Sequence, residues 1–372
     1  MGRLQSLQVG RAIAALGVVF YHLVKLSVEY QNGCFYQPWT EISRCGVDIF
    51  FVISGFVMVA TTYRKMDQPG TGRRFLIHRV SRIYPPYLTL TALLTVFWLF
   101  KPNAVNAKHG GVDLFSSYTL WPSTKLPLLP VAWTLKFEMM FYLVFLGIIL
   151  FVNKRWFAHA LAIWAAIVLA GSLLNWTGVS QAFMASHPAS AGRLFSPLPL
   201  EFIVGCYIGL AAQKIRFVGG KACVIAGLVL FAAEGVLAQF GLMNSYFGGA
   251  NDLVPFFLPP AALIVYGLVA WVRESVSFHP PQWLIRCGDK SYSIYLVHIL
   301  VIHASYRYAW KVLHPFGITA VFLVVTAAAA LLASVCFYKL VEKPFSNWTR
   351  IRLEGIAKVE PKPNAAVGIV AS

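Results

Sequence analysis

The chain alternates between long apolar runs and short basic or polar segments. A helix needs roughly 20 apolar residues to cross the hydrocarbon core of a bilayer, and the apolar runs approach or reach that length. The pattern therefore predicts an all-α, polytopic integral membrane protein with about ten spanning helices. They are expected at residues 8–28, 45–63, 83–100, 133–152, 156–174, 197–213, 222–240, 254–272, 291–310 and 317–338.

The composition supports this fold class. Of 372 residues, 58% are hydrophobic and 12% are charged, whereas a soluble chain carries about 25% charged residues. We assign residues 1–345 to one membrane domain. Residues 346–372 are predicted to form a disordered cytoplasmic tail, whose last stretch, from about Ile356, is rich in Pro, Lys and small side chains.

The formal net charge of +17 would suggest a nucleic-acid partner in a soluble protein, but here the basic residues lie between apolar runs. Once ten spans are assumed, 22 of the 31 Lys and Arg residues fall on one side of the membrane. By the positive-inside rule, that side and both termini are cytoplasmic. We therefore expect membrane lipid, and no nucleic acid, among the partners.

None of the six cysteines forms a CxxC pair, so no metal or redox site is expected. Cys34 and Cys45 fall in the same predicted external loop. They could form a disulfide, but separation in sequence does not determine the geometry that a disulfide needs, so this question stays open.

The first predicted helix carries Arg11 and His22 eleven positions apart. At about 100° per residue both side chains lie on one face, and at 1.5 Å rise they are about 16 Å apart in depth. Charged and titratable groups are costly in lipid, so this face should point into the protein and mark a functional path. A histidine, with a pKa near working pH, is the usual general base.

Three further polar residues fall within predicted spans. Asp48 lies near the outer end of the second helix, and Ser54 lies near its middle. Glu138 is about a turn below the outer start of the fourth helix. We therefore expect His22, Asp48 and Glu138 to converge in the outer leaflet, where the carboxylates would assist the imidazole.

Cations gather at the opposite depth. Arg79 and Arg82 share a helix face at i, i+3 spacing, just before Pro85-Pro86, which should disturb that helix and expose backbone polar groups. Other basic residues lie at a similar depth, and arginine grips phosphate groups bidentately, so this side suits a polyanion. They are Arg11, Arg74, Arg286 and Lys290.

Each of these residues also has a plainer interpretation. Arg79 and Arg82 could be topology anchors, and Asp48 could belong to a structural ion pair. Ser54-Gly55 is better explained by close helix packing than by a nucleophilic serine. Four other side chains could also have a structural role. His22 and His298 could each be an ordinary interior histidine, and Glu138 could be a local partner of Lys136. Glu201 could cap its helix rather than contact the acceptor.

A cytoplasmic phosphate site with a base on the far side favours acyl transfer to a hydroxyl group, without a covalent enzyme intermediate. Several motifs, in this order, resemble the membrane acyltransferase family 3, and most closely its exopolysaccharide O-acetyltransferases of the succinoglycan or xanthan type. The motifs are Arg11-x10-His22, GVDIFFVISGF, Arg79-xx-Arg82 before IYP, Trp133-Thr134-Leu135 with Glu138, GDKSYSIYLVH and EKPF from Glu342 to Phe345.

The resemblance implies a ten-helix core in a bacterial inner membrane, with acetyl-CoA as donor substrate and no permanently bound cofactor. It implies that Arg11 and His22 are essential, that Arg79 and Arg82 contact the donor, and that Glu138 lies near the acceptor path. The acceptor would be a polysaccharide or a lipid-linked oligosaccharide. We add Ser54 and Lys290 to the donor-binding candidates, and Trp133 and Glu201 to the acceptor-binding candidates.

Two other classes of protein remain possible at this point. A proton-coupled transporter would also need intramembrane His, Asp and Glu, although the internal repeats typical of carriers are missing from the sequence. A non-catalytic subunit of a polysaccharide export machine would not need a cation cluster and a base at set depths.

Overall fold

A computed structural model describes residues 5–31, 36–102, 111–123, 125, 127–176, 196–242, 254–274, 280–310 and 319–359. Within these ranges the chain is almost entirely helical, as predicted. The longer helices are α1 (Gln5–Gln31), α2 (Gly46–Thr62), α3 (Thr71–Phe100), α5 (Ala132–Phe151), α6 (Phe157–Trp176), α9 (Pro199–Lys214), α10 (Gly220–Gln239), α11 (Val254–Glu274), α13 (Ser291–Ala304), α15 (Thr319–Phe337) and α16 (Lys343–Val359).

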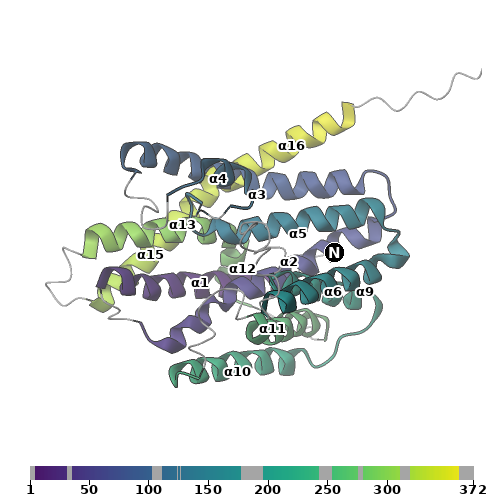
Figure 1. Cartoon of the computed structure of the whole chain (residues 1–372), viewed down its shortest axis with the longest axis horizontal. Helices are drawn as coiled ribbons and strands as arrows, with labels where there is room; N and C mark the ends of the chain where they lie inside the picture. Colours follow the sequence, from purple (N-terminus) through teal and green to yellow (C-terminus); the bar gives the residue numbers. More distant parts are fainter. Residues whose placement is uncertain are drawn as a thin grey trace, which may run out of the picture.

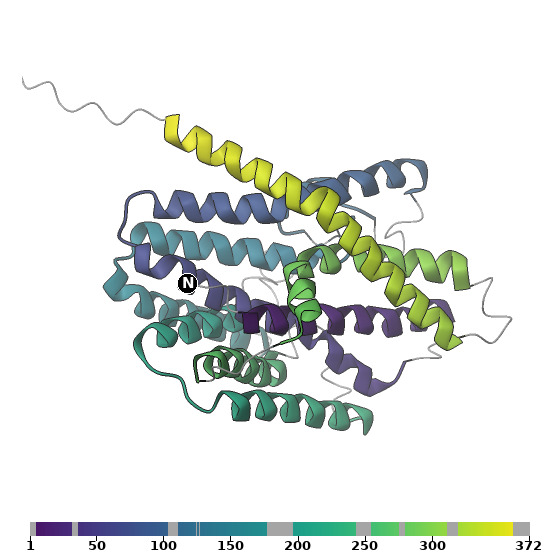
Figure 2. The same cartoon turned by 180° about the vertical axis from the view of Figure 1, so that it is seen from behind.

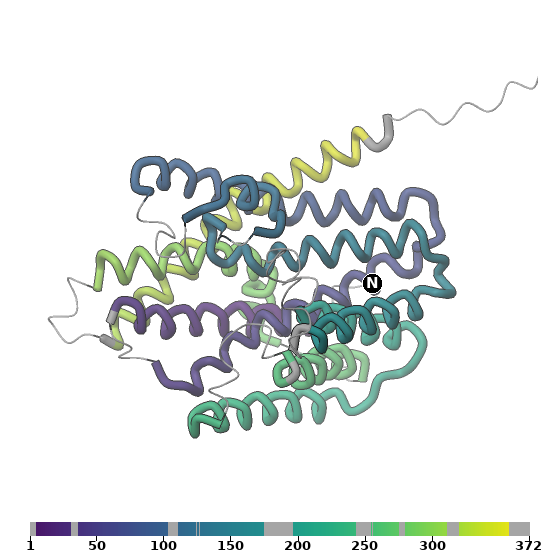
Figure 3. Tube along the Cα trace, viewed as in Figure 1, coloured from purple at the N-terminus to yellow at the C-terminus, as the bar shows by residue number. Residues whose placement is uncertain are grey.

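Short helical segments connect or extend these helices. They are η1 (Pro38–Cys45), η2 (Tyr63–Lys65), α4 (Leu114–Thr119), η5 (Lys154–Trp156), α12 (Gln282–Asp289), and the π-helical turns η7 (Ser305–Ala309) and η9 (Tyr338–Glu342). Most long helices run along the longest axis of an elongated bundle (Figure 1). Seen from behind, α16 crosses the bundle obliquely and extends past it (Figure 2). Figure 3 follows the same path as a tube, with the remaining residues in grey.

All ten predicted spans are helical, but they differ in length. Eight segments of the described chain are long and apolar enough to cross a membrane. α9 has 16 residues, and at 1.5 Å per residue it is shorter than a ~30 Å hydrocarbon core. α13 has 14 residues and continues directly into η7, but this segment is not among the eight. The chain is thus a helical membrane protein, while the count of ten spans and the side of the termini stay predictions.

Glycines bring α2 and α9 into backbone contact. A Cβ atom built on Gly55 would lie 1.9 Å from the Phe202 carbonyl oxygen, and one on Gly205 would lie 2.0 Å from the Val52 carbonyl oxygen. Small residues allow this approach between membrane helices. The packing interpretation of Ser54-Gly55 is therefore confirmed for Gly55.

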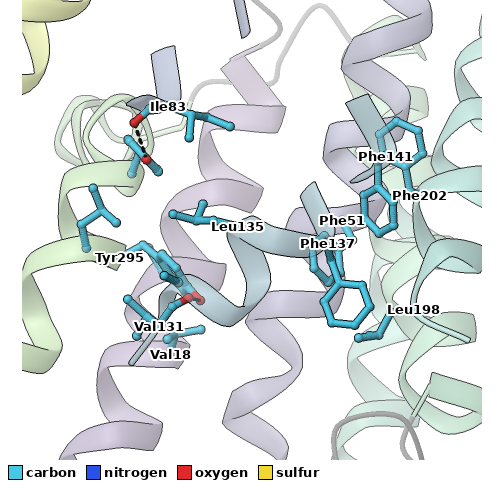
Figure 4. Packing of buried hydrophobic residues seen from close by; sticks show 14 of the residues in the cluster. Val18, Phe51, Ile83, Val131, Leu135, Phe137, Phe141, Leu198, Phe202 and Tyr295 are labelled. Atoms are coloured by element: carbon cyan, nitrogen blue, oxygen red, sulfur yellow. Dashed lines mark hydrogen bonds between the residues drawn. The ribbon is translucent and has the colours of Figure 1, made fainter. Parts of the chain in front are cut away.

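Aromatic side chains fill the core next to this contact. Phe51, Phe141 and Phe202 are all buried, and the Phe141 and Phe202 rings stack with centroids 4.9 Å apart. Figure 4 shows these three rings grouped with Phe137, while Tyr295 lies apart from them beside Val131. The aromatic cluster holds α2, α5 and α9 together, so that the remaining faces of α2 and α5 can line internal cavities.

Two features of the helices differ from the expectations. α3 runs as one helix through Pro85 and Pro86, and carbonyl groups near the prolines bond to hydroxyls: Ile83 accepts from Tyr292 at 2.9 Å, and Pro85 accepts from Thr89 at 2.9 Å. The carbonyl groups that lose a helix N–H partner to these prolines are those of Ser81 and Arg82, four residues earlier, and α3 continues across this interruption.

The second difference concerns the predicted tail. Residues 346–359 continue as α16, which packs against α3. Contact with α3 provides tertiary support for a segment that has too little apolar character to be recognised as a buried helix by itself. Residues 360–372 lie outside the described residues, as does Cys34, so the possible bond to Cys45 stays a prediction.

Candidate active site

A basic cavity of about 520 Å³, here called the vestibule, opens between α1, α3, α12, η9 and α16. Of the described residues, two carboxylates line it, Asp289 and Glu342. Seven Lys and Arg side chains line it as well: Arg11, Lys65, Arg74, Arg79, Arg82, Lys343 and Arg350. This excess of positive charge suits a ligand with several phosphate groups.

Arg79 is the most deeply placed of these cations. Its side chain is buried between the rings of Phe75 and Tyr142, each 5.6 Å from the guanidinium carbon. The Nε–H group is shielded from solvent and has no hydrogen-bond partner within the described part of the chain. A buried, unpaired donor is costly, so it indicates that a ligand supplies the missing acceptor.

A second space, the central cavity, continues from the vestibule and has a volume of about 600 Å³. Arg11, Arg79 and Arg82 line both spaces, which shows that they adjoin. Beyond these arginines the walls are mainly apolar, with Ser54 and Arg273 among the polar side chains, and Arg273 donates to the Ala212 carbonyl oxygen at 2.5 Å. The central cavity therefore suits a long, uncharged arm attached to a phosphorylated head.

Glu138 lines the central cavity, where it accepts hydrogen bonds from Tyr142 and, at 3.4 Å, from Ser54. The expected convergence of Glu138 with His22 and Asp48 is not seen. Glu138 follows Trp133 by five residues, about 7.5 Å along α5, and it faces the arginines instead. Its position suits a counter-charge for Arg79 and Arg82 rather than a partner of the histidine.

The third space, the histidine pocket, has a volume of about 290 Å³ and brings His22 and Asp48 together, as expected, beside the acceptor-binding candidate Trp133. Val47 and Tyr295 line both this pocket and the central cavity. The three spaces thus form a row that leads from the cation cluster to His22.

Hydrogen bonds determine which nitrogen of His22 is available. His298 Nδ1 lies 2.8 Å from the Ile294 carbonyl oxygen, so this nitrogen carries the proton and Nε2 of the neutral ring is an acceptor. His22 Nδ1 lies 3.1 Å from His298 Nε2 and 3.0 Å from the Val18 carbonyl oxygen. Nδ1 must therefore carry the proton of neutral His22, which leaves its Nε2 as a lone-pair acceptor.

Asp48 and Glu201 form a carboxyl pair at the wall of the histidine pocket. The exposed fraction is 6% for Asp48 and 0% for Glu201, and the two side chains interact. Two buried carboxyl groups this close do not both ionise readily. Only Asp48 lines the pocket. Glu201 lies behind it, away from the acceptor contact that the sequence predicted.

Lys290 is the donor-binding candidate that the structure places elsewhere. It lines none of the three spaces; it donates to the Arg286 carbonyl oxygen at 2.8 Å and lies over the Tyr338 ring. Among the described residues, no group of three or more His, Cys, Asp or Glu side chains could hold a metal ion.

Sequence reasoning missed two groups of residues. Arg44 lines the histidine pocket and lies 3.9 Å from Glu41, which also pairs with Lys25 and accepts from Tyr36 at 3.1 Å. Burial and the Glu41 carboxylate raise the pKa of Tyr36 to about 12, so its hydroxyl remains a donor. The second group consists of the vestibule residues on α16. They were missed because the sequence assigned this segment to a disordered tail.

Comparison with known proteins shows the family of the chain. A family model described as an acyltransferase domain matches residues 4–339. The exopolysaccharide production protein ExoZ of Rhizobium meliloti (strain 1021) is 29% identical over 84% of this chain and 92% of its own length. The acyltransferase MdmB of Streptomyces mycarofaciens is 29% identical over 82% of this chain and 80% of its own length.

A more distant relative covers nearly the whole chain. A Staphylococcus aureus (strain COL) protein whose name includes the term O-acetyltransferase is 23% identical over 95% of this chain. The match spans 58% of that longer protein. No solved structure matches the chain.

Proposed function

The chain belongs to the acyltransferase-domain family, and from this premise we propose that it is a membrane O-acetyltransferase. The donor is acetyl-CoA, which enters from the cytoplasm through the vestibule. The acceptor is a hydroxyl group of a polysaccharide or lipid-linked oligosaccharide, as suggested by the similarity to ExoZ. The enzyme acts in the bacterial inner membrane.

The observation that carries this proposal is the row of three spaces between the cations and His22 Nε2. Acetyl-CoA has the same order of chemistry: a phosphorylated head, a long uncharged pantetheine arm and a thioester at the far end. With its phosphates against Arg11, Arg79 and Arg82, the arm extends through the central cavity. The thioester then reaches the histidine pocket.

The chemistry at His22 follows from its protonation state. The lone pair on Nε2 takes the proton of the acceptor hydroxyl while the hydroxyl oxygen bonds to the thioester carbonyl carbon. The carbon–sulfur bond then breaks, and the sulfur takes the proton back from Nε2 and leaves as CoA thiol. A negative charge on Asp48, at the pocket wall, favours the transient imidazolium.

Trp133 and Tyr21 give the histidine pocket two aromatic faces, and Arg44 adds a positive charge to its wall. Flat aromatic surfaces suit the apolar faces of a sugar ring, so these residues are placed to hold an acceptor with one hydroxyl toward His22. Ser54 also supports the donor site, because its hydroxyl donates a hydrogen bond to Glu138 at 3.4 Å.

The decisive experiment uses membrane vesicles that contain the native glycan acceptor and receive acetyl-CoA labelled in the acetyl group. We expect label to appear in glycan esters with the wild-type protein and to fall at least a hundredfold with His22→Ala. His159→Ala is the matched control, because His159 contacts Trp156 and lines none of the three spaces. Labelling that His22→Ala leaves intact would remove His22 from its role, and solute uptake without any acetyl transfer would favour a transporter.

A further inference from the structure

One wall of the vestibule is formed by α16, and its residues are arranged by helical periodicity. Lys343, Ser346, Asn347 and Arg350 all line the vestibule, and their i, i+3, i+4, i+7 spacing places them on one face. The outward face is apolar instead. It carries Phe345, Trp348, Ile351 and Ile356, with exposed fractions of 48–64%, and suits contact with the lipid around the bundle.

The cations of the vestibule lie at two depths. Arg11, Arg79 and Arg82 also line the central cavity and are therefore the inner group. A second group lines the vestibule alone and is therefore farther from His22: Lys65, Arg74, Lys343 and Arg350. A ligand whose negative charge sat at a single point would use only one of these groups.

Two further observations indicate that the outer group faces a ligand. Ser346 Oγ lines the vestibule, is shielded from solvent and has no hydrogen-bond partner among the residues that the structure describes. Across the vestibule, the Arg74 guanidinium is held by the carbonyl groups of Pro69, at 3.0 Å from Nη2, and Gly70, at 3.4 Å from Nε. An oriented cation and an unsatisfied hydroxyl on facing helices form a site for a phosphate group.

We propose that α16 and the first turns of α3 bind the 3′-phosphate of coenzyme A, an inference that rests on the proposed donor. In that donor the diphosphate joins the pantetheine arm directly, whereas the 3′-phosphate lies on the ribose, at the opposite end from the thioester. With the thioester at His22, the diphosphate meets the inner cations. The 3′-phosphate, with about two negative charges, then lies between Arg74, Lys343, Ser346 and Arg350.

The test compares acetyl-CoA with acetyl-3′-dephospho-CoA in the labelled-vesicle assay. Losing a phosphate held by charge-assisted hydrogen bonds should raise the wild-type KM for the donor by tenfold or more. In the double variant Lys343→Ala/Arg350→Ala, which keeps Arg74 and Ser346, the KM for acetyl-CoA should rise toward that of the dephospho donor, so that the ratio of the two KM values falls several-fold toward one. The kcat should stay unchanged, because the thioester end is untouched.

The matched control is Arg352→Ala on the same helix. Arg352 stacks on Trp348 at 5.7 Å and does not line the vestibule, so this variant should keep the wild-type KM ratio. Ser346→Ala is a smaller change and should lower the KM ratio by part of that amount. If the double variant does not fold, the KM ratio of Ser346→Ala is the test of the 3′-phosphate site. Equal use of both donors by the wild-type protein, or a wild-type ratio in a folded double variant, would overturn the 3′-phosphate site. Absence of transfer from either donor would overturn the proposed function itself.

Discussion

Replacing His298 with leucine is expected to slow the chemical step without weakening donor binding. His298 is fully buried on α13 and does not line the vestibule or the central cavity. It acts through His22, whose Nδ1–H it accepts at 3.1 Å. As the acceptor hydroxyl is deprotonated, His22 becomes positively charged and this hydrogen bond strengthens. His298 is therefore a positioning residue that stabilises the imidazolium.

The size of the effect follows from the two acceptors near His22 Nδ1. The Val18 carbonyl oxygen, at 3.0 Å, remains in the leucine variant, so the tautomer of His22 is retained. What is lost is one hydrogen bond to a charged group, worth about 1.5–3 kcal/mol. The kcat should fall about tenfold to about a hundredfold, with the KM for acetyl-CoA unchanged.

Steady-state rates with both variants and a control decide this prediction. His298→Gln keeps an acceptor on the side chain and should recover part of the lost kcat. His303→Leu is the matched control, because His303 lies on the same helix, bonds to Tyr30 at 3.1 Å and lines none of the three spaces. The reasoning is refuted if a folded His298→Leu protein keeps the wild-type kcat, or if its loss appears only in KM.

Three further predictions concern packing, donor binding and a helix cap. Gly55→Val forces a side chain into backbone 1.9 Å away, so folded protein on size-exclusion chromatography should largely disappear, whereas Gly147→Val meets nothing within 4 Å and should remain folded. Arg79→Lys removes the buried Nε–H and the planar fork, so the KM for acetyl-CoA should rise about tenfold in the vesicle assay; an unchanged KM would exclude Arg79 from donor binding. Asp113 caps α4 and its pKa is lowered below 3.8 by the Ser116 N–H and the Ser123 hydroxyl, so its stabilisation is present above that pH and lost below it. Asp113→Ala should speed amide exchange in α4 about fivefold at pH 7 and less at pH 3, and equal acceleration at both pH values would contradict a role for the charged carboxylate.

Much of the architecture could be predicted from local patterns. The apolar runs located all ten helical segments, because the length of a run is a property of the sequence alone. The spacing of Arg11 and His22 predicted one face of one helix, and the structure places both on the row of cavities. Asp48 also lies in one pocket with His22, as expected from its place near the outer start of its helix.

The relations between helices depended on tertiary structure. Periodicity sets the direction of a side chain around its own helix, but not the rotation or depth of that helix against another. Glu138 therefore faces the arginines rather than His22, and Glu201 lies behind Asp48 rather than at the acceptor. For the same reason, periodicity could not predict the contact between α13 and α1. In this contact His298 accepts a hydrogen bond from His22 Nδ1 and thereby fixes the tautomer of His22.

What the sequence predicted by itself is a helical membrane acyltransferase with cations at one depth and a candidate histidine base at another. What only the tertiary structure decided is that three spaces connect them, which nitrogen of the base is available, and that α16 is a wall of the vestibule. The physical reason is that cavities and hydrogen bonds between helices arise from side chains distant in sequence, whose meeting depends on the packing of the whole bundle.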